Sequence, residues 1–148
     1  MKILKLMALD KEDLSILSAY MQDAVLKAAD LDYRKSENRF LLAGNRFVWE
    51  EVDGRRRKSY ERRRSALHFN RVTAVRSRGL NRRDGDRVLS LLAVNFVPGA
   101  EEPAGTIELV FSGDAAIELS VECIEAQLSD LGAAWETTFR PTHPLSDM

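Results

Sequence analysis

The chain has 148 residues, the length of one domain, and its 45% hydrophobic and 30% charged residues are a globular balance that excludes wholesale disorder. No stretch approaches the about 20 apolar residues of a transmembrane helix, and lysines interrupt the short apolar N-terminus, so we expect neither a membrane span nor a signal peptide. The single Cys123 excludes an internal disulfide framework, and the sequence predicts a cytoplasmic protein.

A net charge of −1 hides a strong separation of charge along the chain. Residues 34–87 hold 17 Lys and Arg against 7 Asp and Glu, whereas residues 88–148 hold 1 against 10. The basic residues are densest in residues 55–64, which contain six arginines, one lysine and a single acid, Glu61. The two blocks either neutralise each other across the fold or leave a basic surface free to bind a partner.

The first predicted elements are a strand and a helix. Residues 3–9 form a short apolar stretch, which we expect to be a strand. Asp10 is placed to cap the next helix, and two acids in the first turn suit the helix dipole. Apolar residues then recur at helical spacing, so we predict an amphipathic helix over residues 11–22 with its apolar face in the core.

Strands and turns follow the helix. Residues 25–33 and 39–49 are separated by a polar cluster and predict a hairpin, with a bulge at Gly44-Asn45. Residues 50–64 are charged and lack apolar periodicity, so we expect an exposed basic loop, with a turn at Asp53-Gly54 before its arginine run. Residues 67–78 predict another strand.

The remaining chain predicts three strands and a helix. Residues 87–97 are almost continuously apolar, which is typical of a strand buried on both faces. Residues 106–111 and 115–121 alternate in polarity and predict a tight hairpin in which Gly113 or Asp114 takes a positive φ. Ile124, Leu128 and Leu131 recur at helical spacing, so we predict a C-terminal helix that ends at Gly132. Trp135 and Phe139 are expected to dock the tail that follows. We expect residues 141–148 to be flexible.

This order of elements predicts a single α+β domain over residues 1–148. Regular β–α–β units are absent, which favours mainly antiparallel strands over a parallel sheet. We expect a bent sheet or a partly closed barrel, with one N-terminal helix and one C-terminal helix that plugs one end. A pleckstrin-homology-like fold, in which a strand meander precedes one final helix, is one such architecture, and this analogy of fold carries no function.

Several stretches resemble a family of uncharacterised bacterial proteins that carry a domain of unknown function. The resemblance covers roughly residues 3–143 and rests on residues 66–72, residues 105–132, Asn45-Arg46-Phe47 and Arg62-Arg63-Arg64. It implies a single-domain bacterial cytoplasmic protein. It brings no activity, cofactor or site residue that can be carried over to this chain.

Familiar catalytic motifs are absent from the sequence. It contains no glycine-rich phosphate loop, nucleophile elbow or calcium loop, and two histidines and one cysteine are too few for a conventional zinc site. We therefore predict no catalytic residues, no cofactor and no metal, and favour a non-enzymatic protein. The alternative is an enzyme with a pocket around His68, which shares a predicted strand face with Asn70. Cys123 is expected to be a structural residue and His143 to be solvated.

The arginine-rich loop is the candidate binding site. Arginine side chains bind phosphate and carboxylate groups in a bidentate way, and aromatic residues lie within and beside the run. We predict that the loop contacts an acidic protein surface or a second copy of the chain. Basic residues interleaved with aromatic ones also suit RNA or single-stranded DNA, so nucleic-acid binding is an alternative. The predicted binding residues are Arg55, Arg56, Arg57, Arg62, Arg63, Arg64, Tyr60 and His68.

Overall fold

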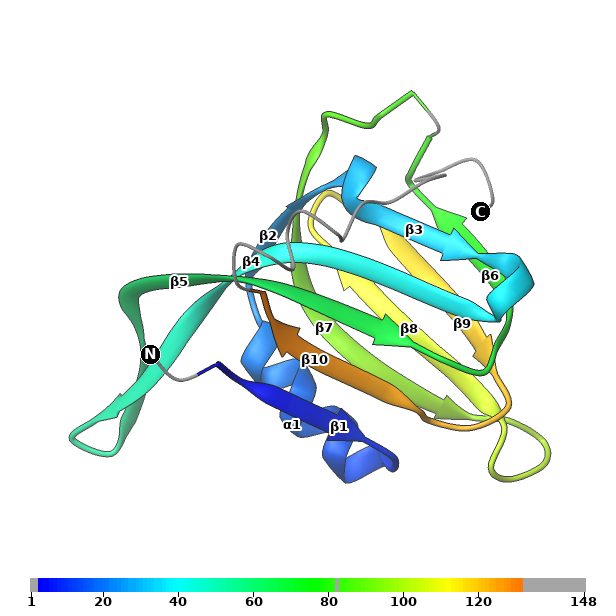
Figure 1. Ribbon diagram of the computed structural model, residues 1–148, viewed down its shortest axis with the longest axis horizontal. Coiled ribbons are helices and arrows are strands. Elements are labelled where there is room, and N and C mark those ends of the chain that lie inside the picture. Colours follow the sequence, from blue (N-terminus) through cyan, green and yellow to red (C-terminus); the bar gives the residue numbers. More distant parts are fainter. Residues whose placement is uncertain (1–2, 82, 132–148) are drawn as a thin grey trace.

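The computed structural model describes residues 3–81 and 83–131, which form a large antiparallel sheet and one α-helix (Figure 1). Helix α1 spans Lys11–Met21, and two short 3-10 helices, η1 at Ala28–Asp30 and η2 at Lys35–Glu37, interrupt the first strands. The strands are β1 Lys5–Ala8, β2 Ala24–Lys27, β3 Leu31–Arg34, β4 Arg39–Val52, β5 Arg55–Phe69, β6 Val72–Arg78, β7 Val88–Pro98, β8 Gly105–Phe111, β9 Ala116–Val121 and β10 Ala126–Asp130.

The strand order in the described residues is β1-β10-β5-β4-β2-β7-β8-β9-β6, with β3 paired to the other end of β4. The sheet bends so that β4 and β5 lie across from β8 and β9 (Figure 1). The prediction of a mainly antiparallel bent sheet is confirmed. The sheet does not close into a barrel, because β1 and β6 end the strand order without pairing with each other.

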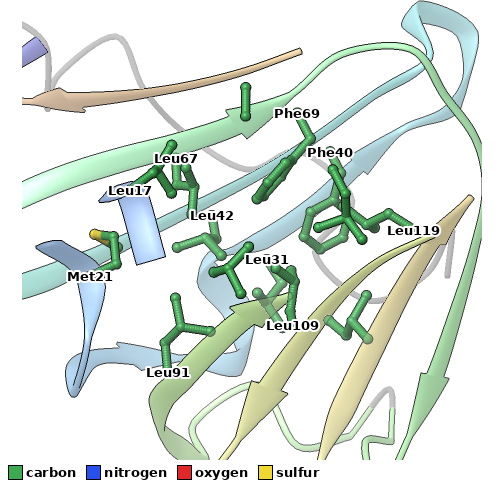
Figure 2. Close-up of a cluster of buried hydrophobic side chains, with 14 of the residues drawn as sticks. Leu17, Met21, Leu31, Phe40, Leu42, Leu67, Phe69, Leu91, Leu109 and Leu119 are labelled. Carbon is green, nitrogen blue, oxygen red and sulfur yellow. The ribbon is translucent and has the colours of Figure 1, made fainter. Parts of the chain in front are cut away.

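The hydrophobic core lies between the two halves of the bent sheet. Phe40 and Phe69, from β4 and β5, face Leu109 and Leu119, from β8 and β9 (Figure 2). All four side chains are fully buried. Along β8, alternate residues are buried in this space, which is the pattern expected of a strand with one buried face.

Helix α1 begins where the sequence predicts. The Asp10 carboxylate accepts a hydrogen bond of 2.8 Å from the backbone N–H of Asp13, which makes Asp10 the N-cap. Leu14, Leu17 and Met21 are buried and face β1, β4 and β7. The helix therefore lies against the inside of the sheet and adds its apolar face to the core.

The predicted C-terminal helix over residues 124–131 is wrong, because this segment contains strand β10. Strand β10 pairs with β1 on one side and β5 on the other, and alternate residues along it, Ala126, Leu128 and Asp130, are buried. Apolar residues four apart fit a strand as well as a helix, since both spacings return to the same face. The final helix on which the pleckstrin-homology analogy depended is absent from residues 3–81 and 83–131. Gly132, the docked tail and residues 141–148 lie outside the described residues.

Three strand predictions also need correction. The segment 25–33 is divided by η1, and the segment 67–78 is divided at Arg71, whose φ of 62° reverses the chain. Strand β7 is interior to the sheet but is not buried on both faces, because Val88, Leu92 and Val97 are exposed. By contrast, the β8–β9 hairpin is confirmed, and both Gly113 and Asp114 take positive φ.

Candidate functional site: the arginine ribbon

The segment predicted as a basic loop, residues 50–64, is a β-ribbon, and the loop prediction is wrong. Strands β4 and β5 continue past the body of the sheet and project from one end of the molecule (Figure 1). Asp53 and Gly54 form the two-residue turn at the tip, with φ values of 52° and 73°, which suits a type I′ hairpin. We call residues 47–62 the arginine ribbon.

Cross-strand pairing explains why so many charges form a regular ribbon. Glu50 lies opposite Arg57, and Glu51 lies opposite Arg56. This register places opposite charges on neighbouring strands and reduces repulsion along the arginine run, although neither pair closes to a direct ion pair. The bulge predicted at Gly44-Asn45 is wrong, because both residues pair in regular register; the irregularity of this ladder lies nearer the tip, where residues 59–61 lie opposite Val48.

One face of the ribbon stacks cations on aromatic rings. The Arg56 guanidinium lies 4.0 Å from the centre of the Trp49 ring, and the Lys58 ammonium lies 4.4 Å from the Phe47 ring. The Arg62 guanidinium also lies 4.8 Å from the Phe47 ring. Cation–π contacts of this kind contribute about 0.5–1 kcal/mol at exposed positions. The two rings are therefore covered largely by the ribbon's own cations.

Two of these cations also fasten the ribbon to helix α1. Arg56 donates through Nη1 to Gln22 Oε1 at 2.9 Å and through Nη2 to the carbonyl of Ala19, near the C-terminal end of the helix. Lys58 Nζ lies 3.1 Å from the Asp23 carboxylate. A cation at a helix C-terminus also complements the helix dipole. Arg56 and Lys58 are thus anchors of the ribbon, and their charges are largely satisfied within the chain.

The other cations of the ribbon face solvent. Arg55, Arg57 and Arg62 are exposed, and none of them forms an ion pair with a carboxylate of the described residues. Tyr60 is fully exposed in the bulge. An exposed aromatic ring beside unpaired guanidinium groups is a surface that other molecules can contact.

The last two arginines of the run belong to the body of the sheet instead. Arg63 pairs with Glu61, and an Arg64 guanidinium nitrogen lies 3.5 Å from the Asp30 carboxylate. Both side chains are half-buried. The run that looks uniform in the sequence therefore divides into anchors, internal ion pairs and a small set of free arginines.

His68 lies in the body of the sheet, away from the ribbon. It sits between Leu41 of β4 and Gln127 of β10. Burial lowers the pKa of His68 from 6.5, the positive charge of Arg39 lowers it further, and Glu125 opposes both. The lowered pKa favours the neutral form of the imidazole. Asn70 accepts a hydrogen bond of 3.0 Å from Arg39 Nε, so the structure gives Asn70 a partner other than His68.

A buried ionic cluster, which sequence reasoning missed, ties the base of the ribbon to β10. Arg46 donates two hydrogen bonds of 2.8 Å to the two oxygens of Asp130. The Ser65 hydroxyl donates to the same carboxylate at 2.7 Å, and the backbone N–H of Leu4 donates at 3.0 Å. Burial by itself raises the pKa of Asp130, but these hydrogen bonds outweigh it and hold the pKa below 3.8. The cluster is fully hydrogen-bonded, which suits a structural role.

The comparisons with known proteins place the chain in a family. The sequence profile of the family described as a protein of unknown function, DUF2948, matches residues 4–143. The chain belongs to this family. Neither the curated proteins nor the solved structures that were searched contain a match. The DUF2948 assignment confirms the resemblance seen in the sequence, and it brings no site residue.

Three further observations on this DUF2948 chain concern its chemistry and its surface. Within residues 3–81 and 83–131, no group of three or more His, Cys, Asp and Glu side chains is arranged to hold a metal ion. In the same residues, no helix is long and apolar enough to cross a membrane. A shallow groove of about 290 Å³ lies between α1 and the ribbon, lined by Ile16, Ala19, Tyr20, Trp49, Glu50, Glu51 and Arg56.

Proposed function

We propose that this chain is a non-enzymatic, cytoplasmic interaction protein that uses the arginine ribbon to contact an acidic protein surface. The observation that carries the proposal is the exposure of Arg55, Arg57 and Arg62 on a ribbon that projects beyond the sheet (Figure 1). A projecting ribbon fixed to a helix presents its side chains in a defined arrangement. Binding then costs less conformational entropy than it would if these arginines lay on a mobile loop.

The position of the free arginines supports a role in binding over simple charge neutralisation. Other members of the basic block do meet the acidic C-terminal part: Arg76 lies 3.1 Å from Glu118, and Arg71 lies 3.6 Å from Glu125. Among the described residues, the ribbon lies near acids of its own and of the N-terminal segments, and none of its cations pairs with the acidic C-terminal part. Its surplus positive charge is therefore available to a partner.

An acidic protein fits the ribbon better than a nucleic acid. Binding of single-stranded nucleic acid uses aromatic rings on which bases stack. Phe47 and Trp49 are covered by the ribbon's own cations, which leaves Tyr60 as the exposed ring of the ribbon.

A binding titration with two triple variants tests the proposal. The ribbon variant carries Arg55→Gln, Arg57→Gln and Arg62→Gln. The matched control, the β6 variant, carries Arg76→Gln, Arg78→Gln and Arg83→Gln, which removes the same charge from another exposed part of the described chain. Fluorescence anisotropy of a labelled polyglutamate peptide is measured at low and at physiological salt, in parallel with a labelled mixed-sequence single-stranded oligonucleotide.

We expect salt-sensitive binding of polyglutamate that weakens by about tenfold in the ribbon variant and changes little in the β6 variant. Equal weakening in both variants, or no binding at low salt, would contradict the proposal. Tighter binding of the oligonucleotide than of polyglutamate, lost in the ribbon variant, would replace the acidic protein by a nucleic acid.

A further inference from the structure

A second groove, of about 360 Å³, lies far from the arginine ribbon. It is bounded by the start of helix α1 and by the loop between β7 and β8. Figure 1 places this loop and the tip of the ribbon at opposite ends of the long axis of the molecule. The chain therefore carries two distinct surface features that do not contact each other within one copy.

The lining of this groove is mostly apolar, with three carboxylates and one lysine among its residues. Leu9 is 61% exposed, and Phe96, Pro98 and Pro103 also line the groove. The carboxylates of Asp10, Glu12 and Glu102 also line the groove, with Lys11 as the cation among the lining residues. Asp10 caps α1, whereas Glu12 and Glu102 are exposed and form no ion pair with a described residue.

The arginine ribbon has the complementary chemistry. Its free guanidinium groups, on Arg55, Arg57 and Arg62, match the carboxylates of the groove in charge. Its exposed apolar side chains, Val52 and Tyr60, match the exposed Leu9 and the Phe96 ring of the groove. We propose that the ribbon of one copy of this chain docks into the groove of a second copy.

This inference rests on the proposed function and names the acidic partner as the chain itself. Burial of Tyr60 against Leu9 and Phe96 supplies the hydrophobic contribution, and the peripheral charges set orientation and association rate. Such a contact joins two different surfaces of the protomers, so it is heterologous and builds rings or open chains unless two copies exchange ribbons reciprocally.

Sedimentation velocity with complementary variants tests this contact. The ribbon variant defined above lacks the free arginines, and a groove variant carries Leu9→Ser, Glu12→Gln and Glu102→Gln. Circular dichroism checks that each is folded. We expect the unaltered chain to associate with rising concentration and to dissociate in high salt, each variant alone to stay monomeric, and their equimolar mixture to form a 1:1 complex. The mixture recovers a complex because one intact ribbon and one intact groove remain.

Three outcomes would overturn the inference: an unaltered chain that stays monomeric at every concentration, a ribbon variant that still associates, or a mixture that stays monomeric. The polyglutamate titration distinguishes a failure of the self-association proposal from a failure of the proposed function. If the unaltered chain is monomeric but binds polyglutamate through the ribbon, the partner is another acidic protein. If it does neither, the ribbon is not a binding surface and both proposals are wrong.

Discussion

Arg46 and Asp130, which are 84 residues apart in the sequence, form a bidentate ion pair with two hydrogen bonds of 2.8 Å. Both side chains are nearly inaccessible to solvent, with 6% and 2% of their surface exposed. The pair links β4, at the base of the arginine ribbon, to β10, which completes the sheet between β1 and β5. The pair therefore ties the base of the ribbon to the body of the sheet, in addition to the strand pairing of β4 with β5.

Removal of one partner of this pair is expected to destabilise the fold strongly. Asp130→Ala leaves the Arg46 guanidinium buried without its carboxylate, so we expect the free energy of unfolding to fall by about 3–5 kcal/mol. The matched control is Glu118→Ala, which breaks the exposed pair with Arg76 and is expected to cost less than about 1 kcal/mol. Urea unfolding measures both changes. Similar losses in the two variants would contradict the structural role of the buried pair.

The titration of the Asp130 carboxylate is expected to destabilise the fold in acid. The pKa of Asp130 lies below 3.8 in the folded chain, so the unfolded chain binds a proton more readily. The contribution of Asp130 is fully present above pH 3.8 and is lost as the pH falls through the folded pKa. We therefore expect unfolding free energies, measured between pH 7 and pH 2, to converge for the unaltered chain and Asp130→Asn at the acid end. A difference between them that stays constant with pH would disprove this titration.

His68 predicts a separate effect at milder pH. Its pKa is lowered from 6.5 by burial and by Arg39, so the unfolded chain binds the proton first as the pH falls. Stability is expected to decline as the pH drops through 6.5 toward the folded pKa, and His68→Gln should remove this part of the decline. Thermal unfolding at a series of pH values from 8 to 5 measures it. An identical pH slope in the variant and the unaltered chain would show that another group titrates there.

The anchoring contacts of the ribbon can be tested independently of binding. Arg56→Ala removes the hydrogen bonds to Gln22 and Ala19 and uncovers the Trp49 ring. We expect faster hydrogen exchange of backbone amides in residues 49–58, with little change elsewhere in the sheet. Arg57→Ala is the control, because Arg57 is exposed in the same strand. Equal acceleration in both variants would show that Arg56 is not an anchor.

Sequence patterns correctly predict the elements whose structure depends on residues close together in the chain. The cap at Asp10, the apolar face of α1 and the β8–β9 hairpin follow from residues close together in the sequence, and all are confirmed. The C-terminal segment could not be assigned this way. Ile124, Leu128 and Leu131 fit a helix locally, but pairing with β1 and β5, which are distant in sequence, makes the segment a strand.

The candidate site shows the same limit. The sequence identifies the arginine run, but its division into anchors, internal pairs and free arginines depends on distant groups that the fold brings near, such as Gln22 for Arg56 and Asp30 for Arg64. The run also lacks apolar alternation, which is why it suggests a loop. Strand pairing and cation–π contacts stabilise the ribbon, and these interactions leave no trace in the pattern of hydrophobic residues along the sequence.

The most direct test of the central claim is to locate an acidic ligand on the protein. Polyglutamate is added to the ¹⁵N-labelled chain, and the ¹H–¹⁵N correlation spectrum is recorded at each step. We expect the amide shifts to concentrate in residues 55–62 and to saturate with the affinity measured by anisotropy. Shifts concentrated at β6, around Arg76 and Arg78, or spread evenly over all basic segments, would contradict the claim that the arginine ribbon is the binding surface.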